Sequence, residues 1–390
     1  MKKFLALLLA ALLVFTLVAC QGTPATPDPT PEPVATPTPE APPVEPDPDE
    51  NGEEGFAASD IHVALVAHSP DSILDDGSFN EGAWSGIQRF LSTHGLSADH
   101  ARFFQPHSAD DVARVDLVAD AIAAGANIVV LPGFHFIDSS AEMQEMFPDV
   151  KFVLLDATPA GGPAANLAAI HYAEEQAGFL AGYAAVMEGY RSLGFMGGIA
   201  VPAVVRFGHG FLQGAEHAAE SLELEEGEVT VLYYYVGGFA PSPEVATTAS
   251  AWFTDGVDVI FAAAGGAGFS VISGAEASGG SVIGVDVDQS GAGDVVITSA
   301  MKALDVSVYD MLTDFLEGAF RGGRELMFDA SVNGIGLPMN TSRFQEFTQA
   351  QYDAIFALLA NGSIAVNNTV TETPSEANLP LSLVEVTELN

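Results

Sequence analysis

IHVALVA, residues 61–67, is a continuous apolar run of the kind that forms a strand buried on both faces of a parallel sheet. Residues 82–94 (GAWSGIQRFLSTH) follow, and in this stretch Ile87, Phe90 and Leu91 recur at helical spacing. An apolar strand followed by an amphipathic helix predicts a βα unit at the start of the folded part of the chain.

The same alternation continues along the chain. Further strand-like apolar runs occur at residues 127–133, 150–156, 192–198, 229–235, 257–263 and 280–286. Helical patterns lie between them, for example at residues 173–188 and 208–221. Such alternation gives open parallel sheets with helices on both faces, and this many units exceeds one sheet. The sequence therefore predicts an α/β fold with two lobes, whose ligand would bind beyond the carboxyl ends of strands.

The N-terminus has the features of a leader segment. Lys2 and Lys3 precede the apolar stretch 4–18, which is short for a membrane span. A small residue then precedes Cys20, the only cysteine of the chain. This order predicts a lipoprotein signal peptide over residues 1–19, and acyl chains on Cys20 would hold the mature protein on the outer face of the cell membrane. A plain secretory peptide, or a single span with a chance cysteine, is the alternative.

The segment after the leader, residues 20–57, is rich in Pro, Thr, Glu and Asp. Such a segment cannot bury enough apolar surface to offset the entropy lost on ordering. Its prolines favour extended polyproline structure, and its like charges repel one another. We interpret it as a disordered stalk that lifts a folded domain away from the membrane, and whether it is O-glycosylated stays open.

The charge balance is extreme, with 52 Asp and Glu against 12 Lys and Arg and a formal net charge of −40. Nucleic acids and anionic lipid surfaces both require a basic face, so this balance excludes them as binding partners. Hydrophobic residues make up 48% of the chain, so the part after the stalk is expected to be globular. One cysteine excludes disulfides and thiolate metal sites in that part.

Seven motifs occur in an order that resembles one known family. They read DDGSFNEGAWSG at residues 75–86, GFLAGY at 178–183, GFMGG at 194–198, RFGHGFLQG at 206–214, AAAGGAG at 262–268, IGVDVDQ at 283–289 and TSAMK at 298–302. The ordered set covers roughly residues 60–340. It is similar to the basic membrane protein family, whose members are lipid-anchored substrate-binding proteins resembling the purine nucleoside receptor of ABC importers.

The resemblance implies a two-lobed, periplasmic-binding-protein-like fold of type I over residues 58–390, with each lobe a parallel sheet flanked by helices and the ligand cleft between them. We expect lobe one to hold about residues 58–170 and 296–335. Lobe two would hold about residues 171–290 and the C-terminal helix near residues 351–359. The resemblance further implies a monomer that delivers a nucleoside to ABC permease subunits and needs no cofactor.

The family's base-binding residues can be carried over to matching positions. Phe79 of the Ser-Phe-Asn motif would stack on the purine, and Phe239, after a Val-Gly-Gly stretch, would stack on its other face. Such stacking is worth roughly 1–3 kcal/mol per base. Asn80 would offer its amide to the ring edge, and Asp156 would accept from base N–H groups. The alternative roles of these residues are structural. They are core packing for the two phenylalanines and helix capping for Asn80 and Asp156.

The sugar would be bound by three further residues. Asp286 would accept from the 2′ and 3′ hydroxyls of ribose, Lys302 would donate to ribose oxygens, and Gly265 would let the backbone approach. Lys302 is notable on composition alone, because Lys151 is the only other lysine once the leader is removed. A lone surface lysine is the alternative interpretation.

One segment departs from the family pattern. In the family an Asp ends the first strand about nine residues before the stacking Phe. Here the loop to Phe79 is longer, His68 stands where that Asp is expected, and Asp71 is another candidate. The base-edge contact, and with it the preference for purine, depends on whether His68 bonds a ring nitrogen or only supports the loop.

Motifs of catalysis do not accompany these residues. The chain lacks a P-loop Gly-Lys-Ser/Thr, a Gly-x-Ser-x-Gly elbow and a His-Glu-x-x-His pair, and its histidines show no metal-ligand spacing. We therefore expect a binding protein and not an enzyme, without a metal site. The alternative function is the same fold acting as a sensor or binder of another small ligand.

Overall fold

The computed structural model describes residues 55–389 of the chain. The predicted signal peptide, Cys20 and nearly all of the predicted stalk lie outside this range. Phe56, which the sequence analysis assigned to the stalk, donates its N–H to the carbonyl of Leu316 and packs on Phe315, with ring centroids 4.7 Å apart. The ordered contacts thus begin slightly before residue 58, because an aromatic side chain at position 56 finds an apolar partner.

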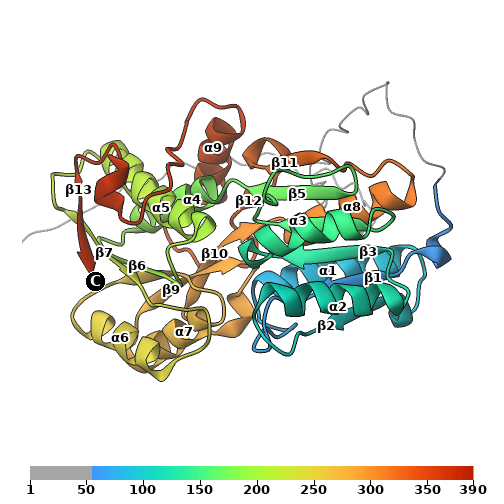
Figure 1. The fold of residues 1–390 in the computed structure, drawn as a ribbon. Coiled ribbons are helices and arrows are strands. Elements are labelled where there is room, and N and C mark those ends of the chain that lie inside the picture. The colour runs from blue at the N-terminus through green and yellow to red at the C-terminus, as the bar shows by residue number, and fades with distance from the viewer. Residues whose placement is uncertain (1–54, 390) are drawn as a thin grey trace, which may run out of the picture. The chain divides into compact units, whose positions relative to one another are not determined.

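The first lobe is built on a six-stranded sheet in which every pairing is parallel. The strands lie in the order β11 (Arg324–Phe328), β5 (Leu167–Tyr172), β4 (Lys151–Leu155), β3 (Ile128–Pro132), β1 (Val63–Val66) and β2 (Ala101–Phe104). Figure 1 shows the helices lying over this sheet. The predicted strand at residues 61–67 is therefore an interior strand of a parallel sheet, between β3 and β2, as its apolar sequence requires.

Side chains of β1 alternate between two apolar cores on opposite faces of the sheet. Val63 and Leu65 belong to one core, and Ala64 and Val66 to the other. Helices α1 (Phe79–Thr93) and α8 (Leu304–Leu316) contribute to the first core, and α2 (Asp111–Ala123) and α3 (Ile137–Met146) to the second. Because both faces are covered, the strand needs no polar side.

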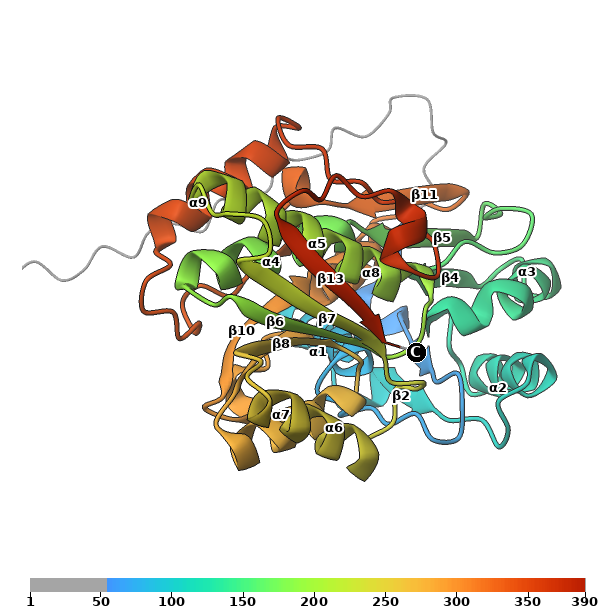
Figure 2. The ribbon, with the colours of Figure 1, turned by 90° about the vertical axis from the view of Figure 1, so that its left-hand side faces the viewer.

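The second lobe is built on a seven-stranded sheet. Its strands lie in the order β12 (Ile335–Gly336), β10 (Val296–Lys302), β9 (Ser281–Asp286), β8 (Val259–Ala263), β6 (Ser192–Gly197), β7 (Val229–Tyr235) and β13 (Val384–Leu389), and only β12 is antiparallel to its neighbour. Figure 2 shows α4 (Glu174–Glu188) and α5 (Pro202–Ser221) on one side of β6 and β7. Helices α6 (Pro243–Thr254) and α7 (Ala267–Ser278) lie on the other side, so this sheet is also covered on both faces.

Helices α4 and α5 pack with their backbones in direct contact. A Cβ atom at Gly178 would lie 2.1 Å from the carbonyl oxygen of Phe207, and one at Gly214 would lie 1.9 Å from that of Phe179. No side chain fits at such distances, so glycine is required at both positions. The close packing fixes the start of α4, which carries Glu174 into the site described below.

The chain passes between the two sheets three times, after β5, after β10 and after β11. Both sheets belong to one compact unit. The sequence analysis had placed residues 296–335 in lobe one, but β10 pairs with β9 in the second sheet, and β12 with β10. The chain returns to the first lobe only with α8, which packs on α1, and with β11. A strand's sequence does not reveal which parallel sheet it joins, so this boundary was misplaced.

The C-terminal helix α9 (Gln349–Ala360) begins with a capping box, in which Thr348 and Gln351 satisfy each other's backbone N–H groups. It packs against α4, as expected for a helix assigned to the second lobe. No helix within residues 55–389 is long and apolar enough to cross a membrane.

Candidate ligand-binding site

A pocket with a volume of about 630 Å³ lies between the two lobes. Its lining comes from segments that follow the carboxyl ends of strands in both sheets: residues 68–81, 132–135 and Asp156 from the first, and residues 201–207, 239–241, 263–269, 285–286 and Lys302 from the second. This is the position that open parallel sheets provide for a ligand. The volume is typical of small-molecule sites.

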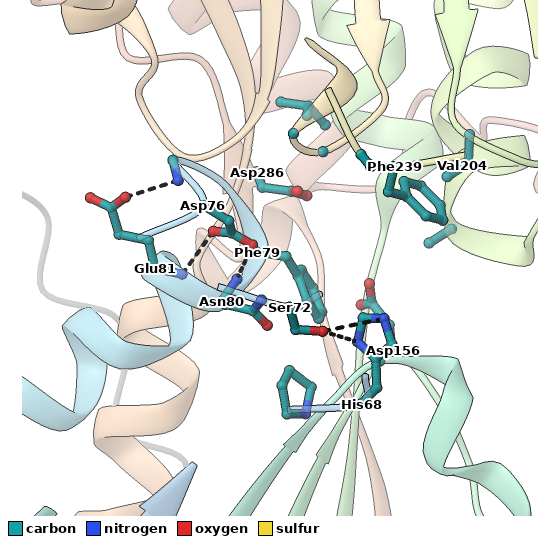
Figure 3. A pocket seen from close by; sticks show the side chains of 18 of the residues that line it. His68, Ser72, Asp76, Phe79, Asn80, Glu81, Asp156, Val204, Phe239 and Asp286 are labelled. Carbon is teal, nitrogen blue, oxygen red and sulfur yellow. Dashed lines mark hydrogen bonds between the residues drawn. The ribbon is translucent and has the colours of Figure 1, made fainter. Parts of the chain in front are cut away.

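All seven ligand-binding residues predicted from the sequence line this one pocket. They are Phe79, Asn80, Asp156, Phe239, Gly265, Asp286 and Lys302. Figure 3 shows Phe79, Asp156, Phe239 and Asp286 around the same space, although they come from different segments of the chain. The predicted lipidation site, Cys20, lies outside the described residues.

Lys302 is the centre of a buried ionic cluster. Its Nζ lies 2.5 Å from Oδ2 of Asp156, 3.4 Å from Oε1 of Glu174 and 3.6 Å from Oδ1 of Asp286. Glu174 is bonded in turn by Arg206, whose Nη1 is 2.6 Å from its Oε2. The alternative of a surface lysine is therefore wrong, since the Lys302 side chain is only 2% exposed.

Aromatic rings complete the surroundings of the ammonium group. Nζ of Lys302 lies 4.9 Å from the ring centre of Phe79, 5.2 Å from that of Phe207 and 5.5 Å from that of Tyr172. A desolvated cation over an aromatic face is stabilised by the ring quadrupole. The position of the ammonium is thus fixed by three carboxylates and three rings together.

The protonation of this cluster follows from its burial. Burial raises the pKa of Asp156 to about 7, although the ammonium of Lys302 acts in the opposite direction. Burial alone would lower the pKa of Lys302, but the carboxylates of Asp156, Glu174 and Asp286 outweigh it and raise that pKa above its ordinary value. Lys302 therefore keeps its charge at neutral pH, whereas the pKa of Asp156 lies close to neutral pH.

Two aspartates in the pocket have a left-handed backbone. Asp156 directly follows β4 with a φ of +58°, and Asp286 ends β9 with a φ of +67°. Aspartate tolerates this region better than most residues, but the conformation is still uncommon and is typical of functional sites. Asp156 does not cap a helix. Its Oδ1 is buried without a hydrogen-bond partner in the structure, so it is an acceptor open to a ligand.

Phe79 and Phe239 are both half-buried at the pocket. Phe79 begins α1, and the carboxylate of Asp76 accepts from the backbone N–H groups of Ser78, Asn80 and Glu81 around it. The side chain of Asn80 donates to the carbonyl of Ile73 at 3.0 Å, so its amide N–H supports the loop. The loop that carries Phe79 is thereby held in one conformation.

Two histidines form a wall of the first lobe that the motifs did not predict. The rings of His68 and His135 are stacked with centroids 4.0 Å apart, and both line the pocket. Buried Arg114 donates to both backbone carbonyls, and Ser72 is hydrogen-bonded to Nδ1 of His68 at 3.2 Å (Figure 3). These bonds from Arg114 and Ser72 hold the two histidines in place at the pocket.

Burial lowers the pKa of each of these imidazoles, His68 and His135, to about 4. The charge of Arg114 acts in the same direction on both, and the neighbouring ring of His135 adds to the effect on His68. Both rings are neutral at pH 7, and a neutral imidazole offers one donor and one acceptor. Asp71 lines the same pocket, so both candidates from the departing loop are at the site.

Sequence reasoning missed four residues that shape the site. Glu174, Arg206, Ser78 and His135 contact or flank the predicted residues, but none carried a predicted role. Glu174 is the first residue of α4, two residues after the end of β5, a position where a carboxylate is stabilised by the helix dipole. Ser78, which precedes the stacking Phe79, and Arg206 both stand in motifs quoted above, so motif position was the available signal.

The chain matches a described protein family over most of its length. The sequence model of the family of PnrA-like ABC transporter substrate-binding proteins matches residues 63–369. Basic membrane protein A of Borreliella afzelii is 27% identical over 324 residues, which cover 81% of this chain and 94% of that protein. The ABC transporter nucleoside-binding protein BmpA of Lactococcus lactis is 26% identical over 314 residues, covering 75% of this chain and 86% of that protein.

Solved structures support the fold. An ABC transporter solute-binding protein from Conexibacter woesei superposes with a TM-score of 0.64 at 25% identity, covering 79% of this chain and 99% of that one. Another, from Aeropyrum pernix, gives a TM-score of 0.62 at 23% identity and covers 79% and 88%. The α/β fold predicted from the sequence is confirmed, and so is the resemblance to the basic membrane protein family. The chain belongs to the PnrA-like family of ABC transporter substrate-binding proteins.

Proposed function

We propose that this protein is a lipid-anchored receptor outside the cytoplasm that binds a nucleoside, with a purine as its base, and delivers it to an ABC importer. The observation that carries the proposal is the convergence of Phe79, Asp286 and Lys302 on one pocket between the lobes. An aromatic ring, a carboxylate and an ammonium in one site suit a flat base joined to a hydroxylated sugar. The name of the Lactococcus lactis relative supports the same ligand class.

Five of the predicted residues contact the ligand in this proposal. Phe79 and Phe239 stack on the base, and Oδ1 of Asp156 accepts from a base N–H. Asp286 and Lys302 bond the ribose hydroxyls. A bound sugar would lie next to the ammonium of Lys302. The ion pairs of this ammonium in the structure are with the carboxylates of Asp156, Glu174 and Asp286.

The conformation of Gly265 supports its predicted role of letting the backbone come close to the ribose. Gly265 has a φ of +53° at the start of the 265–269 segment, and a Cβ there would lie 3.6 Å from the side chain of Phe239. A larger side chain at this position would be strained by its backbone conformation and would narrow the space beside the stacking ring.

Affinity for the nucleoside is expected to exceed affinity for the free base at least tenfold. A site built to bond hydroxyls leaves buried polar groups unpaired when the sugar is missing, at about 1–3 kcal/mol for each group and more for charged ones. Calorimetric titration with guanosine and inosine, and with guanine and hypoxanthine, measures the ratio directly. Asp286→Asn should reduce the ratio, since it removes the carboxylate charge. Equal affinities for nucleoside and base in the wild type would refute the ribose role.

Lipid anchoring is tested separately at Cys20. Cys20→Ser removes the thiol that would accept the diacylglycerol, so the protein should be released into the medium or stay unprocessed. Fractionation and intact-mass measurement of wild type and variant distinguish these results. A correctly processed Cys20→Ser protein that is still retained in the membrane would end the lipoprotein proposal and leave the binding proposal intact.

A further inference from the structure

The loop that carries Phe79 is hydrogen-bonded directly to the second lobe. Ser78 lies in the first lobe, and its Oγ donates to Oδ2 of Asp286 at the end of β9, at 2.6 Å. Gln289, also in the second lobe, donates its Nε2 to the carbonyl oxygen of Gly77 at 2.8 Å. The two bonds join adjacent residues of one loop to one turn of the other lobe.

The bond between Ser78 and Asp286 is buried, so water does not compete with it, and the bond between Gln289 and Gly77 is partly buried. Ser78 is 0% exposed, Asp286 7% and Gln289 5%. Gly77 has a φ of +63°, and a Cβ there would lie 2.3 Å from the ring of Phe269 in the second lobe. The loop therefore meets the second lobe at van der Waals distance, and only glycine permits this approach.

The serine hydroxyl and the lysine ammonium lie on different oxygens of the same carboxylate. Ser78 bonds Oδ2 of Asp286, whereas the nearest approach of Lys302 is to Oδ1, at 3.6 Å. A carboxylate has about four lone-pair sites, so both oxygens can still accept from a ligand. The two contacts fix the rotation of the carboxylate, which sits on an uncommon left-handed backbone.

The serine is itself held rigidly by its own lobe. Its backbone N–H donates to Oδ1 of Asp76 at 3.0 Å, in the same set of bonds that fixes the start of α1. Ser78 and Phe79 are adjacent, so the position of the stacking ring is linked through one residue to the orientation of Asp286. A hydrogen bond to a charged acceptor is stronger than one between neutral groups.

We propose that Ser78 is a positioning residue that orients Asp286 for the ribose hydroxyls and ties the two lobes together beside the ligand. The positioning role rests on the function proposed above, whereas the tie between the lobes does not. Movement of the lobes apart would break the bond between Ser78 and Asp286, so the bond favours the closed arrangement in which base-stacking and sugar-bonding residues act on one ligand.

The test compares Ser78→Ala with Ser140→Ala in the full-length protein. Both variants remove a buried hydroxyl from the first lobe, but Ser140 lies in α3, donates to the carbonyl of Ile137 in its own helix and does not line the pocket. Calorimetry with inosine and hypoxanthine gives the nucleoside-to-base affinity ratio. Hydrogen exchange measured by mass spectrometry, without ligand, reports on residues 75–80 and 284–290.

Ser78→Ala should reduce the affinity for inosine about tenfold and that for hypoxanthine much less. It should also speed exchange in both segments, one in each lobe. Ser140→Ala should leave the affinity ratio and the exchange of residues 284–290 unchanged. A merely structural role of Ser78 would weaken both ligands equally.

The outcomes separate this inference from the proposed function. If the wild type prefers inosine but Ser78→Ala keeps the same ratio and the same exchange at residues 284–290, the inference is overturned and the proposed function stands. If the wild type shows no preference for inosine, the proposed function and the positioning role fail together. The exchange of residues 284–290 then still decides whether Ser78 ties the lobes.

Discussion

Replacing Lys302 with methionine is expected to lower the free energy of unfolding by about 3–5 kcal/mol at pH 8, as removal of one partner of a buried ion pair does. Methionine fills a similar volume, so the loss is mainly electrostatic. Without the ammonium, Asp156, Glu174 and Asp286 would remain together, with only Arg206 on the far side of Glu174 as a counter-charge. Chemical denaturation followed by circular dichroism measures the change.

The same substitution is expected to become less harmful as the pH falls. Burial holds the pKa of Asp156 near 7, above its ordinary value of 3.8, so its ionisation weakens the fold as the pH rises from about 4 to about 7, and the effect is constant above that. Removal of the ammonium raises that pKa further, because Lys302 is the group that lowers it. At pH 5 Asp156 is protonated, and the difference between variant and wild type should shrink.

Lys151→Met provides the matched control for this prediction. Lys151 is the only other lysine within residues 55–389, and its Nζ lies 5.8 Å from the ring centre of Phe320. It lies on β4 of the first lobe, away from the ionic cluster, and its replacement should change the stability by about 1 kcal/mol or less. Equal stability of Lys302→Met and wild type from pH 5 to pH 8 would show that the cluster contributes nothing to the fold.

Six of the seven strands that the sequence predicted are buried along nearly their whole length, and β7 is the exception. Residues 229–235 were predicted exactly as β7, and the runs that became β1, β3 and β4 were predicted within two residues at each end. Six strands were missed, namely β2, β5, β10, β12, β11 (RELMF) and β13 (VEVTEL). The last two were missed for the same reason. Each lies at the edge of its sheet and alternates exposed with more buried positions, so neither is a continuous apolar run.

The site residues were reached through motif order, because no local pattern brings them together. The bond between Ser78 and Asp286 joins residues 208 positions apart, and that between Lys302 and Asp156 joins residues 146 apart. Composition marked Lys302 as unusual, yet only the tertiary structure shows three carboxylates around it. Glu174 lies outside the motifs, since a buried charge has no periodicity of its own, and Arg206 begins the motif at residues 206–214 but was given no role there.

Phe79→Ala and Phe239→Ala are each expected to weaken nucleoside binding by about 1–3 kcal/mol, the usual range for loss of one base-stacking ring. Neither should greatly lower the melting temperature of the protein without ligand, because both rings are only half-buried and face the pocket. Thermal melts of each variant with and without inosine measure stability and ligand-induced stabilisation in one experiment.

Phe90→Ala is the control that makes this experiment decisive. Phe90 lies in the same helix as Phe79 but is 0% exposed in the first-lobe core. Its truncation should lower the free energy of unfolding by about 3–5 kcal/mol and leave the shift caused by inosine unchanged. A stacking residue and a core residue therefore give opposite patterns. If Phe79→Ala behaves like Phe90→Ala, Phe79 serves the core, and the proposed binding of the base loses its most specific residue.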